Sequence, residues 1–176
     1  MIWVDIIIEH NVAAIEDAIK LAKHDISVRA DLKETGANVS LHKDVVNFTA
    51  DNKEMLKQVI KLFEEKLKIS SVNKKSLQYQ AINVTMANVE QKAILQRIFD
   101  IELTNEVVNK INQLPIPVKI DARPERIILS ADTAAKIQEI QDKLKKCKFK
   151  LPITFTNYHE NHHPDNVYDL FTIPKK

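Results

Sequence analysis

Residues 48–63, FTADNKEMLKQVIKLF, and residues 129–144, LSADTAAKIQEIQDKL, decide the fold of this chain. In each stretch a strand pattern is followed by an alanine and an aspartate, and then by the pattern of an amphipathic helix. An offset of 81 residues pairs their apolar positions: Phe48 with Leu129, Leu56 with Ile137, and Phe63 with Leu144. One structural unit is therefore used twice, and Asp51 and Asp132 are expected to cap the two helices.

The periodicity of apolar residues predicts the remaining elements around these two stretches. Alternation and β-branching predict strands at 2–8, 26–33, 37–42, 45–50, 89–97, 117–122, 125–130 and 152–157. Spacings of three and four predict helices at 11–23, 52–67, 103–113 and 133–147. Residues 69–88 follow neither period and are expected to connect the two halves. The predicted fold class is α+β, with two ferredoxin-like (RRM-like) βαββαβ sandwiches.

The composition excludes several large classes of protein. The chain has 176 residues, of which 44% are hydrophobic and 28% are charged, so it suits one or two compact domains. Gly36 is the only glycine. Phosphate loops, dinucleotide fingerprints and nucleophile elbows need glycines. A P-loop NTPase, a Rossmann dehydrogenase and an α/β-hydrolase are therefore excluded.

Charge and cysteine content narrow the class further. A net charge of +2 does not indicate a dedicated DNA-binding protein, so any phosphate contact must come from a local patch. The single cysteine, Cys147, excludes a disulfide framework and a thiolate zinc site, and it is expected to be buried. The opening run, residues 1–8, has no basic region and is interrupted by Asp5. We expect a cytoplasmic protein without a membrane partner.

Three segments of the chain carry a family resemblance. They are Arg29-Ala30-Asp31-Leu32-Lys33 followed by Ala37 to Leu41, then Val59 to Leu67 with Ser76-Leu77, and finally Leu151-Pro152-Ile153-Thr154-Phe155-Thr156-Asn157-Tyr158. In this order they resemble the YajQ (DUF520) family of bacterial nucleotide-binding proteins. The resemblance implies two ferredoxin-like domains that exchange their N-terminal strands. It also implies nucleotide binding, with cyclic dinucleotides as ligands of some members, and no enzymatic activity.

On this resemblance the domain boundaries can be stated. The first domain is expected to span 9–97, and the second to combine 2–8 with 98–158. Residues 159–176 are expected to form a C-terminal tail.

The chain also departs from the family pattern. Glu34 stands where the family usually has glycine, and Ile69-Ser70-Ser71 stands where it has Lys-Arg-Gly. Residues 128–136 replace an arginine- and lysine-rich segment. Most cations that would meet phosphate in the second domain are thereby lost, so the usual ligand site is expected to be weakened, relocated or lost.

Five residues are the candidate nucleotide contacts. Arg29, Asp31 and Lys33 alternate, so on a strand they would project to one face. Arg29 could grip a phosphate or a guanine edge, Lys33 could act as a point charge, and Asp31 could accept from a base amine. Arg123 and Arg126 flank Pro124 at a predicted hairpin tip. The competing interpretation is a solvated surface on which these arginines pair with neighbouring carboxylates.

Other polar clusters have structural explanations of their own. The lysines at 143, 145, 146, 148 and 150 complement the end of a helix, although they could also form a polyanion patch. His159, His162, His163 and Asp165 could ligate zinc or nickel, but we expect a surface-lying tail instead. No catalytic, metal or cofactor site is predicted from spacing.

The first hypothesis is a non-enzymatic nucleotide-binding protein whose ligand is a nucleotide, a cyclic dinucleotide or RNA. The second is a diverged paralogue that has lost nucleotide binding and acts as a protein-interaction module through its apolar tail, residues 164–174. A third reading is a small metal-dependent hydrolase that uses the histidines of the tail.

Overall fold

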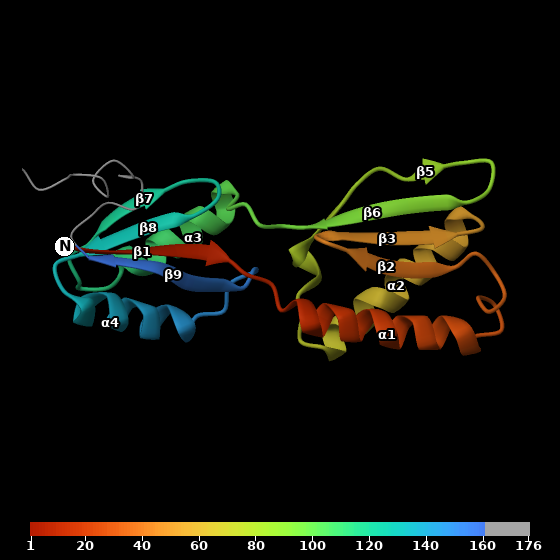
Figure 1. The fold of residues 1–176 in the computed structure, drawn as a ribbon, viewed down its shortest axis with the longest axis horizontal. Coiled ribbons are helices and arrows are strands. Elements are labelled where there is room, and N and C mark those ends of the chain that lie inside the picture. The colour runs from red at the N-terminus through yellow and green to blue at the C-terminus, as the bar shows by residue number, and fades with distance from the viewer. Residues whose placement is uncertain (161–176) are drawn as a thin grey trace, which may run out of the picture. The chain divides into compact units, whose positions relative to one another are not determined.

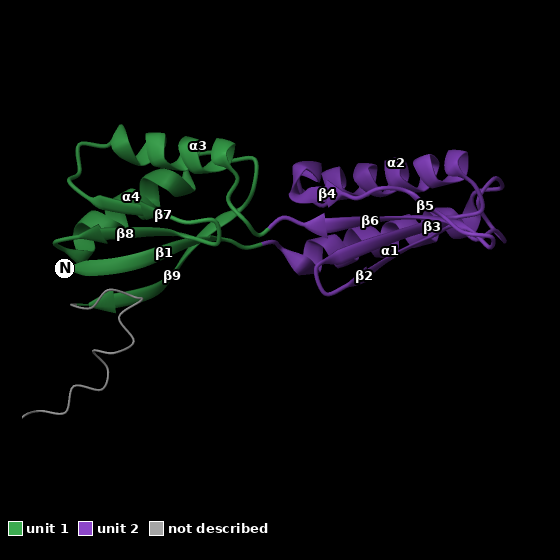
Figure 2. Cartoon of the chain, turned by 90° about the horizontal axis from the view of Figure 1, so that it is seen from above, with its two compact units in different colours: residues 1–9, 97–176 green, residues 10–96 purple. Residues whose placement is uncertain are grey.

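The computed structural model describes residues 1–160, which form two compact units (Figures 1 and 2). Unit 1 combines residues 1–9 with the chain from Arg97 onward, and unit 2 is His10–Gln96. Unit 1 contains β1 (Ile2–Ile8), α3 (Ile101–Asn112), β7 (Lys119–Ala122), β8 (Ile127–Ala131), α4 (Ala134–Lys145) and β9 (Ile153–Glu160). Unit 2 contains α1 (Val12–Val28), β2 (Asn38–His42), β3 (Val45–Ala50), α2 (Lys53–Ile69), η1 (Lys74–Ser76), β4 (Leu77–Tyr79), β5 (Asn83–Val84) and β6 (Val89–Leu95).

The two sheets have matching strand orders, which confirms the predicted α+β class. The sheet of unit 1 runs β7-β8-β1-β9, and that of unit 2 runs β2-β3-β6-β4, with β5 paired to β6. All pairs are antiparallel. Each unit thus has the strand and helix content of a ferredoxin-like βαββαβ sandwich.

β1 and β6 each lie inside a sheet, and their pairing shows why unit 1 is made of two separate segments of the chain. β1 is followed along the chain by α1 of unit 2, yet it pairs with β8 and β9 of unit 1. β6 is followed by α3 of unit 1, yet it pairs with β3 and β4 of unit 2. The N-terminal strand therefore belongs to the sheet of the second half, as the family resemblance implied.

Each core lies between one face of the sheet and two helices. In unit 2, α1 contributes one buried stripe, Ile15, Ala18, Ile19, Ala22 and Ile26, to a core that includes Phe48 and Phe63. In unit 1, alternate residues of β1, Val4, Ile6 and Ile8, pack with Leu103, Val107, Ile137 and Ile140. Spacings of three and four on the helices and of two on the strands produce these faces.

The strand predicted at 26–33 is wrong. α1 continues to Val28, and residues 30–34 form turns. Alternating Ile26, Ser27 and Val28 resemble a strand locally, but Ile26 also continues the buried stripe of α1 and packs into the core. The longer helical period therefore outweighs a short alternation.

The helix caps also differ from those predicted. Asn52 caps α2, because its side chain accepts a hydrogen bond from the backbone N–H of Met55 at 2.9 Å. α4 begins after Thr133, which makes no side-chain cap, while Asp132 accepts from Lys136 at 2.9 Å. Each predicted aspartate therefore lies one residue before the N-cap residue of its helix.

Asp51 instead explains the position of the single glycine. Its Oδ1 accepts from the backbone N–H of Gly36 at 3.0 Å. A Cβ atom at Gly36 would lie 2.5 Å from the same oxygen, which is too close. Glycine is needed at this position because the carboxylate of Asp51 approaches its Cα closely. A left-handed backbone is not the reason, since the φ of Gly36 is not positive.

Candidate functional site

Arg29, Asp31 and Lys33 lie at the end of α1 and not on a strand. Arg29 is the C-cap residue of α1, and the other two follow in the turns. The guanidinium of Arg29 donates through Nε to Oδ1 of Asp31 at 3.1 Å and through Nη2 to Oδ2 at 2.8 Å. The proposed cation and its neighbouring carboxylate therefore form a two-pronged ion pair with each other.

This pairing is reflected in the protonation of both side chains. The hydrogen bonds from Arg29 hold the pKa of Asp31 below its usual value, and those to Asp31 raise the pKa of Arg29. Lys33 is exposed and forms no ion pair with another described residue. A phosphate would meet the ammonium of Lys33 directly, whereas it would compete with Asp31 for the fork of Arg29.

Arg123 and Arg126 belong to the β7–β8 hairpin of unit 1. Arg123 donates to Oδ2 of Asp121 through Nη2 at 2.8 Å and through Nε at 3.1 Å. Arg126 donates through Nη1 to Oδ2 of Asp5, a carboxylate with no exposed surface, at 2.9 Å. Arg126 therefore compensates a buried charge, which is a structural role.

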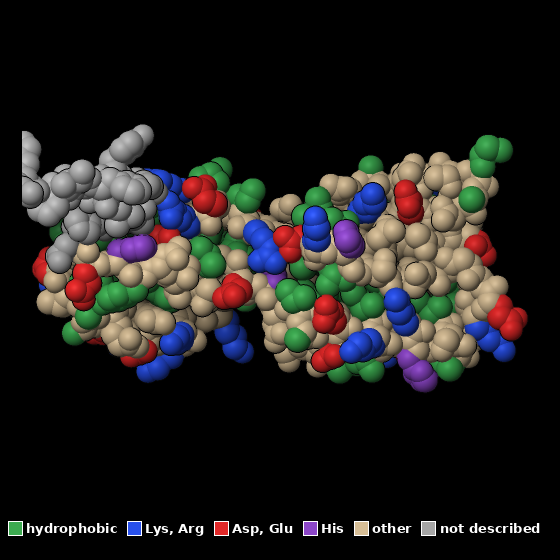
Figure 3. Space-filling model, in the orientation of Figure 1, with side chains coloured by type: hydrophobic (Ala, Val, Ile, Leu, Met, Phe, Trp, Pro, Cys, Tyr) green, Lys and Arg blue, Asp and Glu red, His purple; other side chains and the backbone are tan. Residues whose placement is uncertain are grey.

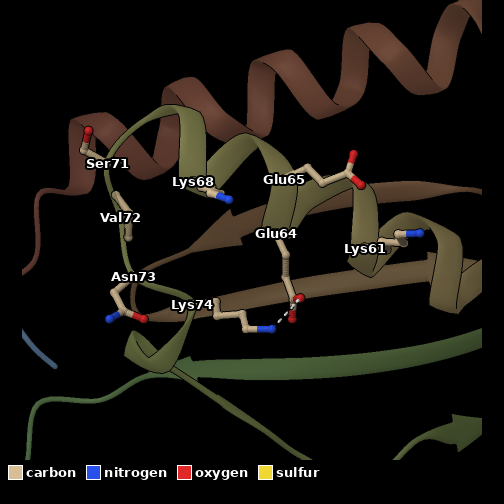
Figure 4. Close-up of a pocket in the computed structure, with 8 residues that line it drawn as sticks. All are labelled: Lys61, Glu64, Glu65, Lys68, Ser71, Val72, Asn73 and Lys74. Atoms are coloured by element: carbon tan, nitrogen blue, oxygen red, sulfur yellow. Dashed lines mark ion pairs between the residues drawn. The ribbon is translucent and has the colours of Figure 1, made fainter.

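A hollow beside the last turns of α2 was not anticipated from the sequence (Figure 4). Its volume is about 630 Å³, and it is lined by Lys61, Glu64, Glu65, Lys68, Ser71, Val72, Asn73 and Lys74. It forms because the chain after α2 turns back alongside the helix, with Ser71 in the left-handed region at a φ of 60°. In the sequence, the lysines and glutamates of α2 that line this hollow look like those of any solvated helix face, so they do not predict a binding site.

The carboxylate of Glu64 is already engaged within this hollow. It accepts a hydrogen bond from the hydroxyl of Tyr79 at 2.8 Å and pairs with Lys74 at 3.6 Å. Burial of the Tyr79 ring, which stacks on Phe48, and the adjacent Glu64 raise the pKa of this phenol. Glu64 thus anchors the wall of the hollow to β4.

The remaining charged groups of the hollow are not paired. Lys61, Lys68 and Glu65 form no ion pair or side-chain hydrogen bond with the rest of residues 1–160. Figure 4 shows the two lysines separated along α2, with both glutamates between them. A bound ligand would therefore find cationic and anionic partners in one place.

A smaller hollow adjoins the first one. It has a volume of about 160 Å³ and is lined by Arg29, Gln58, Lys61, Leu62 and Glu65. Lys61 and Glu65 line both hollows, so Arg29 from the end of α1 lies near the same stretch of α2. The Oε1 atom of Gln58 is buried without a hydrogen-bond partner. Of the five residues predicted from sequence, Arg29 is the one that lines a hollow among those described here.

The lysine run at the end of α4 does not act as one group. Lys150 pairs with Asp100 at 2.7 Å and with Glu102 at 2.9 Å, and the hydrogen bond to Asp100 raises its pKa.

On the face of unit 2 shown in Figure 3, basic and acidic side chains are interspersed. Such a mixed surface lacks the continuous positive track that suits a nucleic-acid backbone.

The other predicted groups give no catalytic arrangement in the described chain. Cys147 is partly exposed and not buried as expected, and its Sγ donates to the carbonyl oxygen of Lys143 at 3.5 Å. His159 lies on β9, whereas His162, His163, Asp165 and the apolar stretch 164–174 lie outside the described residues. Within residues 1–160, three or more His, Cys, Asp or Glu side chains nowhere gather as metal ligands would, and no helix there could cross a membrane.

Comparison with known proteins gives a consistent result. The family model described as "Nucleotide-binding protein YajQ-like" matches residues 3–159. A nucleotide-binding protein of Koribacter versatilis is 28% identical over 89% of this chain and 96% of its own length. Nucleotide-binding proteins of Bacillus cereus and Chloroherpeton thalassium are 25% and 23% identical, each over 88% of this chain and 95% of their own lengths.

Proposed function

Because this chain belongs to the family of YajQ-like nucleotide-binding proteins, we propose that it binds a phosphate-bearing nucleotide ligand without catalysing a reaction on it. The ligand classes are a nucleotide, a cyclic dinucleotide or RNA, and the compartment is the cytoplasm. The observation that carries this proposal is the family match over residues 3–159, which runs through both units. Relatives matched over nearly their whole length are named for binding and not for a reaction.

The geometry supports a site on unit 2. The guanidinium of Arg29 and the ammonium groups of Lys61 and Lys68 line the two adjoining hollows. Charge-assisted hydrogen bonds to phosphate are stronger than neutral ones, so a phosphate there gains the most from these cations. Lys33 remains a proposed contact at the end of α1, and Asp31 is assigned to holding Arg29 in place.

The arginines of unit 1 contribute less to this proposal. Arg126 is committed to Asp5, and Arg123 is held by Asp121. A ligand that recruits Arg126 would leave a buried carboxylate uncompensated, which is costly. Arg123 stays a candidate phosphate contact because its partner Asp121 is about half exposed.

Calorimetric titration of the full chain at low salt tests the proposal. ATP, GTP, cyclic di-GMP and a short RNA are titrated separately, and micromolar binding to at least one of them is expected. The affinity should fall as salt is raised, because cations contact phosphate. Absence of binding to all four ligands at low salt would overturn the proposal.

A protein-interaction role is the second candidate, and one surface observation favours it. Around β5, Ile82, Val84 and Met86 alternate along the chain and are 39%, 59% and fully exposed. Apolar side chains exposed together are typical of docking surfaces. Cross-linked recovery of partners by the full chain should then fall for Val84→Asp with Met86→Asp. A chain ending at Tyr158 tests the tail separately, since unchanged recovery would exclude a role for it.

A further inference from the structure

We infer that the larger hollow beside α2 binds a single nucleotide. Its phosphate is held by the ammonium groups of Lys61 and Lys68, and its ribose hydroxyls donate to the carboxylate of Glu65. This inference rests on the proposed function and narrows its ligand to a mononucleotide, in preference to a cyclic dinucleotide or RNA.

The dimensions of the hollow favour a small molecule. Pockets of roughly 300–1,000 Å³ hold single small ligands, and this hollow measures about 630 Å³. The residues that line it come from α2 and from the returning segment 71–74, so the hollow extends over about two turns of one helix (Figure 4). A nucleic-acid strand is instead held along an extended positive groove.

Lys61 and Lys68 supply the positive charge for the phosphate end of one nucleotide. They are seven residues apart, or about 10 Å along the helix axis. Their flexible four-carbon stems are longer than the side chains of the two glutamates between them, so both ammonium groups can turn towards a phosphate group that lies outside the carboxylates. Neither ammonium is neutralised by a carboxylate elsewhere in residues 1–160.

The helix dipole does not account for both lysines. Lys68 lies in the last turn of α2, where a cation complements the negative end of the helix. Lys61 lies two turns earlier, beyond the range of that effect. At the junction of the two hollows its ammonium is therefore available to a ligand in either of them.

The two glutamates between the lysines decide the class of ligand. Phosphates distributed along the whole ligand, as the successive phosphates of RNA or the two separated phosphates of a cyclic dinucleotide are, would come beside these carboxylates and be repelled. A mononucleotide places its charge at one end and offers hydroxyl and amino donors at the other. Glu64 already accepts from Tyr79, so Glu65 is the carboxylate left to accept from ribose.

The smaller hollow gives the nucleobase a place beside the sugar. It shares Glu65 with the larger hollow and contains Gln58, whose Oε1 is buried without a partner. A buried acceptor without a hydrogen bond costs free energy, and an amino group on a base edge would satisfy it. Arg29, in the same hollow, presents a planar face on which a base can stack.

The test compares two matched double variants by calorimetry with ATP at low salt. Lys61→Gln with Lys68→Gln removes both proposed phosphate contacts and is expected to weaken binding by about tenfold or more. Lys53→Gln with Lys57→Gln makes the same charge change on exposed residues of α2 outside the hollows, and its affinity should stay within about twofold. Thermal unfolding of each variant checks that the fold is retained.

A third variant tests the role of Glu65. The native chain is expected to bind ATP more tightly than its dideoxy analogue, because the analogue lacks the hydroxyls that Glu65 accepts from. Glu65→Gln should reduce this preference by at least half, since a carboxylate accepts more strongly than an amide. An unchanged preference would overturn the assignment of Glu65.

The outcomes separate this inference from the proposed function. Equal ATP affinities of the two lysine variants would place the nucleotide elsewhere and overturn the inference, while ATP binding itself would support the proposed function. Binding of cyclic di-GMP or RNA but not of ATP would also overturn the inference alone. A chain that binds none of these ligands would overturn both.

Discussion

Asp5 on β1 accepts a hydrogen bond of 2.9 Å from Nη1 of Arg126, which lies 121 residues later in the chain. Asn157 donates to the same carboxylate oxygen at 3.0 Å. Asp5 has no exposed surface, so these two donors replace the water that an aspartate would otherwise bind. β1 is therefore fixed to the β7–β8 hairpin and to β9 by side chains as well as by backbone pairing.

Removing Arg126 should destabilise unit 1. Arg126→Met leaves the buried carboxylate of Asp5 without its cation, and we expect the free energy of unfolding to fall by about 3 kcal/mol. Urea denaturation followed by circular dichroism measures this change. Lys136→Met, which breaks the exposed pair with Asp132, is the control and should have a much smaller effect. Equal effects would show that the Asp5 pair behaves like a surface ion pair.

Gly36→Ala should act through Asp51. The added Cβ displaces the carboxylate, and the loss of the hydrogen bond from the Gly36 N–H is expected to cost about 1 kcal/mol. Asp51→Ala removes the same bond and should cost a similar amount. Because both changes remove one interaction, the double variant should be no less stable than the worse single variant. Additive losses in urea denaturation would contradict this explanation.

The phenol of Tyr79 should make stability depend on alkaline pH. Its pKa is raised in the folded state, so above pH of about 10 the unfolded chain releases this proton while the folded chain retains it. The free energy of unfolding should therefore be unaffected by Tyr79 below that pH and decrease above it. Tyr79→Phe should reduce the slope measured by urea denaturation between pH 9 and 11. An unchanged slope would show that Tyr79 ionises equally in both states.

The ion pair at the end of α1 should compete with ligand. Asp31→Asn weakens the hold on Arg29, so the guanidinium becomes available to the ligand, and nucleotide affinity should increase about threefold. Arg29→Gln should decrease it. Calorimetry with the ligand that binds the native chain measures both changes. Affinities that do not respond to either substitution would exclude Arg29 as a contact.

Strong periodicity made most of the fold predictable from sequence. β1 and β3 were predicted with their observed bounds, because β1 is rich in β-branched residues and β3 alternates buried with partly exposed residues. β4, in contrast, has three residues; Leu77 joins the core and Tyr79 stacks on Phe48, but a stretch this short shows no clear period in the sequence. Residues 69–88 were predicted as a connection, and they contain β4 and β5 because β6 offers a free edge.

The candidate site was less accessible to sequence reasoning. Arg29 was predicted as a contact because it alternates with Asp31 and Lys33 on a predicted strand. In the structure it lies at the end of α1 instead, and it lines the smaller hollow. Lys61 and Lys68 appeared as ordinary residues of a solvated helix face. Their relation depends on segment 71–74 turning back along α2, which is a tertiary feature that spacing within one helix does not encode.

The placement of β1 also affects how the protein is made. This largely apolar strand is synthesised well before its neighbour β8, which begins 125 residues after it, at Ile127. At about 5–20 residues per second, it waits roughly 6–25 seconds for that neighbour to be synthesised. Residues 10–96 can meanwhile complete their own sheet, since all its strands lie within that segment. Until β8 has been synthesised, β1 therefore remains an unpaired apolar strand, and such exposed segments of a nascent chain are the kind that chaperones protect from aggregation.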